Sequence, residues 1–221
     1  MEAVLKVGGS LADDPTSLAN LCQELSALSK THRILIVPGG GEIADIVSKF
    51  DKTYSLSDVV AHKMAVLAMD QYGFLLSDIT PESYVSPSLE EISNSAKGTL
   101  PIFLPSKLIF REDPLEHSWD VTSDTITAYI AQLLNAEKLI LVTDVDGIFS
   151  EDPKKSLNTK LIEELPAEEL LGWNMRTSVD KMLPKILLQA NLDCYVVNGK
   201  HPERIKRILE NKKTVCTKIT L

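Results

Sequence analysis

The sequence predicts an α/β fold in which a mostly parallel sheet is covered by helices on both faces. Short apolar segments alternate with segments of helical periodicity throughout residues 1–221, a pattern typical of parallel sheets. Two of the apolar segments end in glycine-rich turns that lead into helices, at residues 8–9 and 39–41. Because the sequence contains no internal repeat, low-complexity segment or linker, we expect a single domain spanning residues 1–221.

Composition and charge argue against some classes of binding partner. Hydrophobic residues make up 44% of the chain and charged residues 24%, values typical of a globular protein with a sizeable core. The net charge of −8 and the lack of a basic cluster argue against nucleic acid or an anionic membrane as partner. The chain has no apolar run long enough to span a membrane and no signal-peptide pattern, so we expect a cytoplasmic protein.

The cysteines and histidines do not have the spacing of a metal site. The chain contains three cysteines and four histidines, all widely separated. We therefore expect reduced thiols and no metal ligands from the protein.

The first ten residues predict a buried strand that ends at an anion-binding turn. Residues 4–7 are largely apolar, and Gly8, Gly9 and Ser10 follow them. Adjacent glycines let backbone N–H groups point at a ligand, and Ser10 is expected to cap the next helix, whose N-terminal end favours an anion. The ammonium of Lys6, one step inside the strand end, can reach the same anion. An ordinary strand–turn–helix junction with a surface lysine is the alternative.

A second junction of the same kind follows. Residues 15–29 have the spacing of a helix with one buried face, and residues 33–37 predict the next strand. That strand ends in Pro38 and the glycines at 39–41, and residues 43–50 predict a helix. Parallel strands present their carboxyl ends at one edge of the sheet, where ligands bind. We therefore expect the two glycine turns to hold a polyphosphate between them.

The middle of the chain is less regular. Residues 57–76 predict a long helix in which His62 is a core or surface residue. Residues 77–99 are polar and contain prolines, which indicates weak structure, a lid or an edge strand. Residues 100–104 predict a strand, and residues 107–110 an edge strand or hairpin arm. The apolar positions of this helix include Val60, Met64, Leu67 and Leu75.

A carboxylate begins the next helix. Thr122 or Ser123 is a natural N-cap for the apolar periodicity that continues to residue 134. Asp124 then falls in the first turn, where the helix dipole favours a negative charge. Capping alone would account for these residue types.

The remaining elements continue the alternation. A strand over residues 138–142 ends in a loop at 143–149, and Pro184 predicts a kink or a late start for the helix at 178–190. The other predicted elements are helices at 166–171 and 203–209 and strands at 194–197 and 215–219.

These motifs together resemble the amino acid kinase superfamily, which includes carbamate, acetylglutamate, aspartate, uridylate and isopentenyl phosphate kinases. The resemblance covers almost the whole chain and implies a three-layer α/β/α sandwich around about eight strands, in an oligomer of identical subunits. It rests on an ordered set: Lys6-Val7-Gly8-Gly9-Ser10, Pro38-Gly39-Gly40-Gly41, Thr122-Ser123-Asp124, residues 143–149, Asp152-Pro153-Lys154 and Met182-Leu183-Pro184-Lys185.

The resemblance implies ATP and Mg²⁺ as cofactors and assigns the site residues. Lys6 and Lys185 would flank the transferred phosphoryl group, and Asp124 would hold both lysines. Magnesium would bridge the ATP phosphates with few or no protein ligands. The phosphates would lie against Gly8, Gly9, Ser10, Gly39, Gly40 and Gly41. Adenine and ribose would contact Thr143, Asp144, Val145, Gly147, Ile148, Phe149, Asp152, Pro153 and Lys154.

One branch of the family is the most similar. Residues 104–106, 117–124 and 179–181 resemble the kinases of methanofuran biosynthesis that phosphorylate an aminomethylfuran-methyl phosphate to its diphosphate. That acceptor is a flat ring with a cationic arm. Trp119 would contact the ring or the cation, although packing at a helix edge would also explain it. The candidates for the amine are Asp45, Asp120 and Asp180.

Departures from the family pattern leave alternatives open. Residues 180–181 stand where many members have two glycines, and residues 42–50 lack the histidine typical of isopentenyl phosphate kinases. The alternatives are an isopentenyl phosphate kinase-like enzyme, an acid kinase, and a non-catalytic nucleotide-binding or storage protein. A carboxylate acceptor would favour an arginine near the second glycine turn, and residues 39–50 contain none. A pure binder would not need Lys6, Asp124 and Lys185 together.

Overall fold

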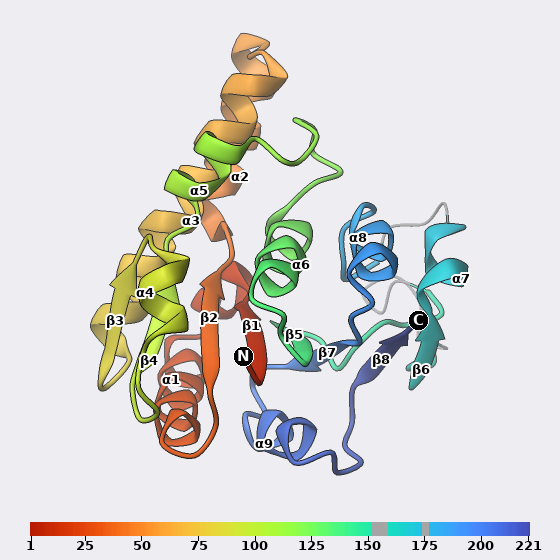
Figure 1. Ribbon diagram of the computed structural model, residues 1–221. Coiled ribbons are helices and arrows are strands. Elements are labelled where there is room, and N and C mark those ends of the chain that lie inside the picture. The colour runs from red at the N-terminus through yellow and green to blue at the C-terminus, as the bar shows by residue number, and fades with distance from the viewer. Residues whose placement is uncertain (152–158, 174–176) are drawn as a thin grey trace.

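The computed structural model describes residues 1–151, 159–173 and 177–221. Its centre is an eight-stranded sheet in the order β3-β4-β2-β1-β5-β7-β8-β6 (Figure 1). Every neighbouring pair is parallel except β7 and β8. The strands are β1 (Ala3–Val7), β2 (Ile34–Pro38), β3 (Ser83–Ser86), β4 (Leu100–Phe103), β5 (Lys138–Thr143), β6 (Glu164–Pro166), β7 (Cys194–Asn198) and β8 (Thr217–Thr220). The prediction of a mostly parallel sheet is confirmed.

Helices cover both faces of this sheet. They are α1 (Pro15–Ser29), α2 (Gly41–Tyr54), α3 (Asp58–Ile79), α4 (Leu89–Ser93), α5 (Ser106–Glu112), α6 (Ser123–Leu133), α7 (Ala167–Leu171), α8 (Leu183–Ala190) and α9 (Glu203–Leu209). A short 3₁₀ helix, η1 (Gly9–Asp13), follows β1. In Figure 1, α6 and α8 lie above the strands and α1 and α9 below them.

Successive side chains of each strand point to opposite faces of the sheet, so the core has two layers. Val4 and Leu139 point into the layer formed with α6 and α8, whereas Leu5 and Ile140 point into the layer formed with α1 and α9. Both faces of the central strands are therefore apolar, which is why these strands read as continuous apolar runs in the sequence. No described helix is long and apolar enough to cross a membrane.

Among the local predictions, one was wrong, one was confirmed in part, and one strand was missed. Residues 106–112 form helix α5 instead of an edge strand, with Leu108 and Ile109 buried. Its first residue, Ser106, donates hydrogen bonds from its backbone N–H and hydroxyl to the Asp70 carboxylate of α3. The region 77–99 is ordered, and the alternative of an edge strand is confirmed: α3 continues to Ile79, and then come β3, at the edge of the sheet, and α4. The prediction also missed β6, which is only three residues long. Short apolar runs do not distinguish a helix from a strand without tertiary contacts.

Several apolar residues of α3 lie on its exposed face. Val60 and Leu67 are each 44% exposed, and Leu75 is 46% exposed. The face that packs against the sheet instead carries Ala61, His62, Val66, Ala68, Met69, Tyr72, Gly73 and Leu76. A Cβ on Gly73 would lie 2.7 Å from Leu104 Cδ2, so the small side of the helix allows the closest approach. An apolar helix has no single stripe from which its packing side can be read.

Candidate active site

The two glycine turns meet at the carboxyl ends of β1 and β2, as expected from the parallel sheet. The Gly39 N–H donates to the Val7 carbonyl at 2.8 Å. A Cβ on Gly9 would lie 2.0 Å from Gly41 Cα, so no side chain fits between the turns. Gly41 also has a φ of +56°, which favours glycine. The close contact leaves bare backbone on the surface that a phosphate would approach.

Ser10 does not cap the first helix. Helix α1 begins after Asp14, whose carboxylate accepts from the Ser17 N–H at 3.1 Å. Ser10 lies in η1 instead, and its hydroxyl donates to Asp144 Oδ1 at 3.2 Å. Ser10 therefore connects the first glycine turn with the loop after β5.

Lys6 and Asp124 form an ion pair beside these turns. Lys6 Nζ lies 2.9 Å from Asp124 Oδ1, and the two side chains are 13% and 7% exposed. Strand β1 supplies the lysine and the first turn of α6 supplies the carboxylate. The expected contact of Asp124 with both lysines is only partly seen: among the described residues its salt-bridge partner is Lys6, and Lys185 is exposed on α8.

Asp180 connects the helices that carry Asp124 and Lys185. Its carboxylate accepts from the N–H and hydroxyl groups of Thr122 and Thr125, at the start of α6. It also accepts at 2.8 Å from the N–H of Leu183, the first residue of α8. Its own N–H donates to Asp124 Oδ2 at 3.2 Å. Burial and the charge of Asp124 raise the pKa of Asp180. These contacts favour a positioning role over the predicted contact with the acceptor amine.

The loop after β5 divides into ligand-facing and core residues. Asp144 contacts Ser10, whereas the Ile148 side chain is only 1% exposed and belongs to the core. The Ile148 N–H donates to Thr217 Oγ1 at 2.7 Å, and a Cβ on Gly147 would lie 2.4 Å from that hydroxyl. Gly147 and Ile148 thus fix the path of the loop, and only their backbone remains for a nucleotide. Phe149 pairs with Leu161 in an isolated β-bridge.

Three predicted nucleotide contacts lie outside the described part of the chain, and a residue that was not among the predicted contacts attaches the loop to α9. Asp152, Pro153 and Lys154 lie outside the described residues. Asp146, within the loop, forms an ion pair of 2.6 Å with Arg204 of α9. Partial burial would raise the pKa of Asp146, but hydrogen bonds from Arg204 and Asn198 outweigh it and lower that pKa. This ion pair attaches the loop to α9.

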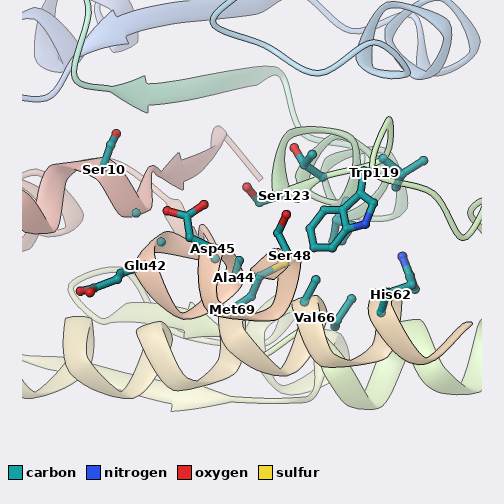
Figure 2. A pocket seen from close by; sticks show the side chains of 18 of the residues that line it. Ser10, Glu42, Ala44, Asp45, Ser48, His62, Val66, Met69, Trp119 and Ser123 are labelled. Carbon is teal, nitrogen blue, oxygen red and sulfur yellow. The ribbon is translucent and has the colours of Figure 1, made fainter. Parts of the chain in front are cut away.

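A cavity of about 590 Å³ opens next to the Lys6–Asp124 pair. Figure 2 shows Ser10 near one end of the cavity, Trp119 and His62 at the other, and Asp45 and Ser48 between them. The walls come from η1, the first turns of α2, the first half of α3, and the loop before α6. The lining residues include Lys6, Gly9, Ser10, Gly40, Gly41, Asp45, Ser48, Asp58, His62, Val66, Met69, Trp119 and Ser123.

The structure separates the four predicted acceptor residues. Asp45 and Trp119 line this cavity together. The Trp119 indole is 42% exposed, and its Nε1 donates to Asp51 Oδ2 at 2.8 Å, so the ring is oriented by α2. Asp120 faces a second cavity and forms an ion pair of 3.0 Å with Lys181. Asp180 also lines that second cavity.

Sequence reasoning missed Asp58 and His62 as cavity residues. His62 is only 7% exposed, and its ring centroid lies 4.9 Å from that of His117. Burial, with a smaller effect of His117, lowers the pKa of His62. The spacing of four residues between Asp58 and His62 was the only signal in the sequence, because it places both on one face of a helix.

The charge of this cavity is mainly negative. Lys6 is its only lysine or arginine in the described part of the chain, whereas Asp13, Glu42, Asp45 and Asp58 contribute carboxylates. The described residues contain no group of three histidine, cysteine or acidic side chains that would hold a metal ion. A bound phosphate would therefore meet Lys6 and backbone N–H groups at one end, and the rest of the molecule would meet carboxylates.

Comparison with known proteins identifies the family. Residues 1–198 match the sequence profile of the amino acid kinase family. The chain belongs to the amino acid kinase family. The family match and the eight-stranded sheet together confirm the predicted amino acid kinase fold.

Relatives within the amino acid kinase family are similar over their full length. The chain is 38% identical over 216 residues to the [5-(aminomethyl)furan-3-yl]methyl phosphate kinase of Methanocaldococcus jannaschii, covering 98% of this chain and 96% of that one. Uridylate kinase from Archaeoglobus fulgidus superposes with a TM-score of 0.78 at 21% identity and covers 100% of both chains. An isopentenyl phosphate kinase superposes with a TM-score of 0.67 at 21% identity, covering 99% of both chains.

Proposed function

We propose that this protein is an ATP-dependent kinase that transfers the γ-phosphoryl group to a phosphate monoester, and that the monoester carries an aminomethylfuran group. The relative at 38% identity supports this reaction. The single observation that carries the proposal is the buried Lys6–Asp124 pair at the meeting point of the two glycine turns, next to an acidic cavity. A phosphate end and a cationic end of one acceptor match the two ends of that cavity.

The residues present fit ATP and Mg²⁺. The contact between Gly9 and Gly41 leaves bare backbone for phosphates, and Lys6 supplies a cation. Magnesium, when bound with ATP, neutralises phosphate oxygens and needs few protein ligands. Lys6 and Lys185 would flank the transferred group and stabilise the charge that develops on it. Asp124 holds Lys6 in place, and Asp180 holds the starts of α6 and α8 together.

A panel of phosphate monoesters tests the proposed reaction. The purified protein is incubated with ATP and Mg²⁺, ADP release is measured, and the product is examined by phosphorus NMR. We expect ADP to form fastest with aminomethylfuran-methyl phosphate and the product to show coupled diphosphate resonances. A higher kcat/KM for isopentenyl phosphate or for a carboxylic acid would assign a different acceptor. ATP binding without turnover of any acceptor would instead support the storage or binding protein.

We also propose that two copies associate through α3. Its exposed face carries Val60, Leu67 and Phe74, spaced by seven residues and 44%, 44% and 57% exposed. An apolar seam of this spacing is typical of a helix that packs against another helix. The acceptor cavity uses the opposite side of α3, where Val66 and Met69 lie.

The substitution Leu67→Glu tests this association. We expect the wild type to elute as a dimer or larger oligomer and the variant to shift toward the monomer, because each new carboxylate would be buried at the seam. Size-exclusion chromatography with light scattering measures the mass. Gln23→Glu on α1 adds the same charge at an exposed position outside α3 and should leave the mass unchanged. A monomeric wild type would contradict the proposal.

A further inference from the structure

His62 is a buried side chain with an unpaired polar atom. His62 is only 7% exposed, and its Nε2 atom has no hydrogen-bond partner among the described residues. Buried polar atoms without a partner are rare, and each costs free energy of folding. His62 lines the cavity next to Trp119, as Figure 2 shows. The geometry therefore points to a partner that enters with a ligand.

The neighbours of His62 pack against its ring and disfavour its charged form. Its ring stacks at 4.9 Å on His117, whose Nε2 already lies 2.7 Å from Asp113 Oδ1. Burial lowers the pKa of His62, and the nearby His117 lowers it further, with Asp113 opposing. A neutral imidazole offers one nitrogen that accepts a hydrogen bond. His117 is paired with Asp113, and of the two histidines it is His62 that lines the cavity.

The same end of the cavity has the features of a cation site built around a flat ring. Asp58 lies one helical turn before His62 on α3 and also lines the cavity. Val66 and Met69 provide an apolar floor, and Trp119 provides an aromatic wall that Asp51 orients. A primary ammonium has three N–H donors, so it can bond a carboxylate and an imidazole nitrogen at once.

We propose that His62 determines the specificity for the acceptor by accepting, at Nε2, a hydrogen bond from a primary ammonium group at the end of the acceptor remote from its phosphate. Asp58 supplies the counter-charge. The inference rests on the proposed function and adds the group that the cavity recognises. An acceptor without the amine leaves the buried Nε2 of His62 unpaired, and a site with an unpaired buried polar group rejects such a molecule.

Substitution at His62 tests the proposal with two acceptors. Aminomethylfuran-methyl phosphate is compared with its analogue in which a methyl group replaces the aminomethyl group. In His62→Leu we expect kcat/KM for the amine acceptor to fall about tenfold or more, the usual range for a hydrogen bond to a charged group. The KM for ATP and the activity with the methyl analogue should change little. His62→Gln should keep most of the preference, because its amide oxygen can accept at the position of Nε2.

Controls separate this proposal from the proposed function. His32→Leu removes a histidine that pairs with Glu2 away from the cavity and should leave both acceptors unaffected. An unchanged preference in His62→Leu, with the wild type active on the amine acceptor, would overturn the role of His62 and leave the kinase assignment intact. If the wild type phosphorylates neither acceptor, the proposed acceptor is wrong. Calorimetric binding of the amine acceptor then tests the role of His62 separately. Equal affinity of the wild type and His62→Leu would overturn that role, and weaker binding to the variant would support it.

Discussion

Asp124→Asn is expected to lower kcat/KM by about a hundredfold or more, without recovery at high pH. Asparagine keeps the size of the side chain and can still accept from the Asp180 N–H, but it loses the charge that holds the Lys6 ammonium 2.9 Å away. In the proposed reaction the acceptor phosphate is already ionised near neutral pH, so it needs positioning and charge neutralisation more than a base. The measurement is a profile of kcat/KM against pH for the variant, on protein shown to be folded.

The pH profile distinguishes two roles for Asp124. If it organises Lys6, activity stays low at every pH. If it is a general base, alkaline conditions would restore much of the activity, because the acceptor would then lose its proton to solvent. Recovery would also indicate an acceptor that must be deprotonated, which would argue against a phosphate monoester.

Lys6→Ala and Lys185→Ala are each expected to lower kcat about a hundredfold and to change the KM for ATP much less. Each would remove a positive charge next to the transferred phosphoryl group. Their effects on stability should differ. Removal of Lys6 leaves the buried Asp124 without its counter-charge, at a cost of about 3 kcal/mol. Lys185 is exposed, so its removal should change the free energy of unfolding by about 0.5 kcal/mol or less.

Steady-state kinetics and urea unfolding of the same preparations measure both effects. Lys30→Ala, which removes a surface lysine that pairs with Glu82, is the comparison and should leave both quantities near wild type. The double variant Lys6→Met with Asp124→Asn should regain stability without regaining activity, since it removes the uncompensated charge and the catalytic cation together. A kcat near wild type in Lys6→Ala or Lys185→Ala would remove that lysine from the mechanism.

The sequence by itself determined the class of fold and the meeting of the two glycine turns, where we propose that phosphate binds. Apolar strands alternate with periodic helices, and parallel strands bring their carboxyl ends to one edge, so the two glycine turns had to meet. Lys6 and Asp124 could be selected because each occupies a definable position, one at a strand end and the other in the first turn of a helix. These features depend on local periodicity and on residues with special backbone or charge properties.

Only the tertiary structure decided the acceptor end. The face of α3 that packs inward was not readable, because apolar residues lie on several sides of the helix and close approach at Gly73 selects the inner one. Asp120 directly follows Trp119 but pairs with Lys181, and Asp180, from a later motif, binds the start of α6. His62 lines the cavity together with residues of α2 and of the loop before α6, so its neighbours come from distant parts of the chain. Periodicity describes one element at a time, whereas the acceptor end is formed by contacts among four of them.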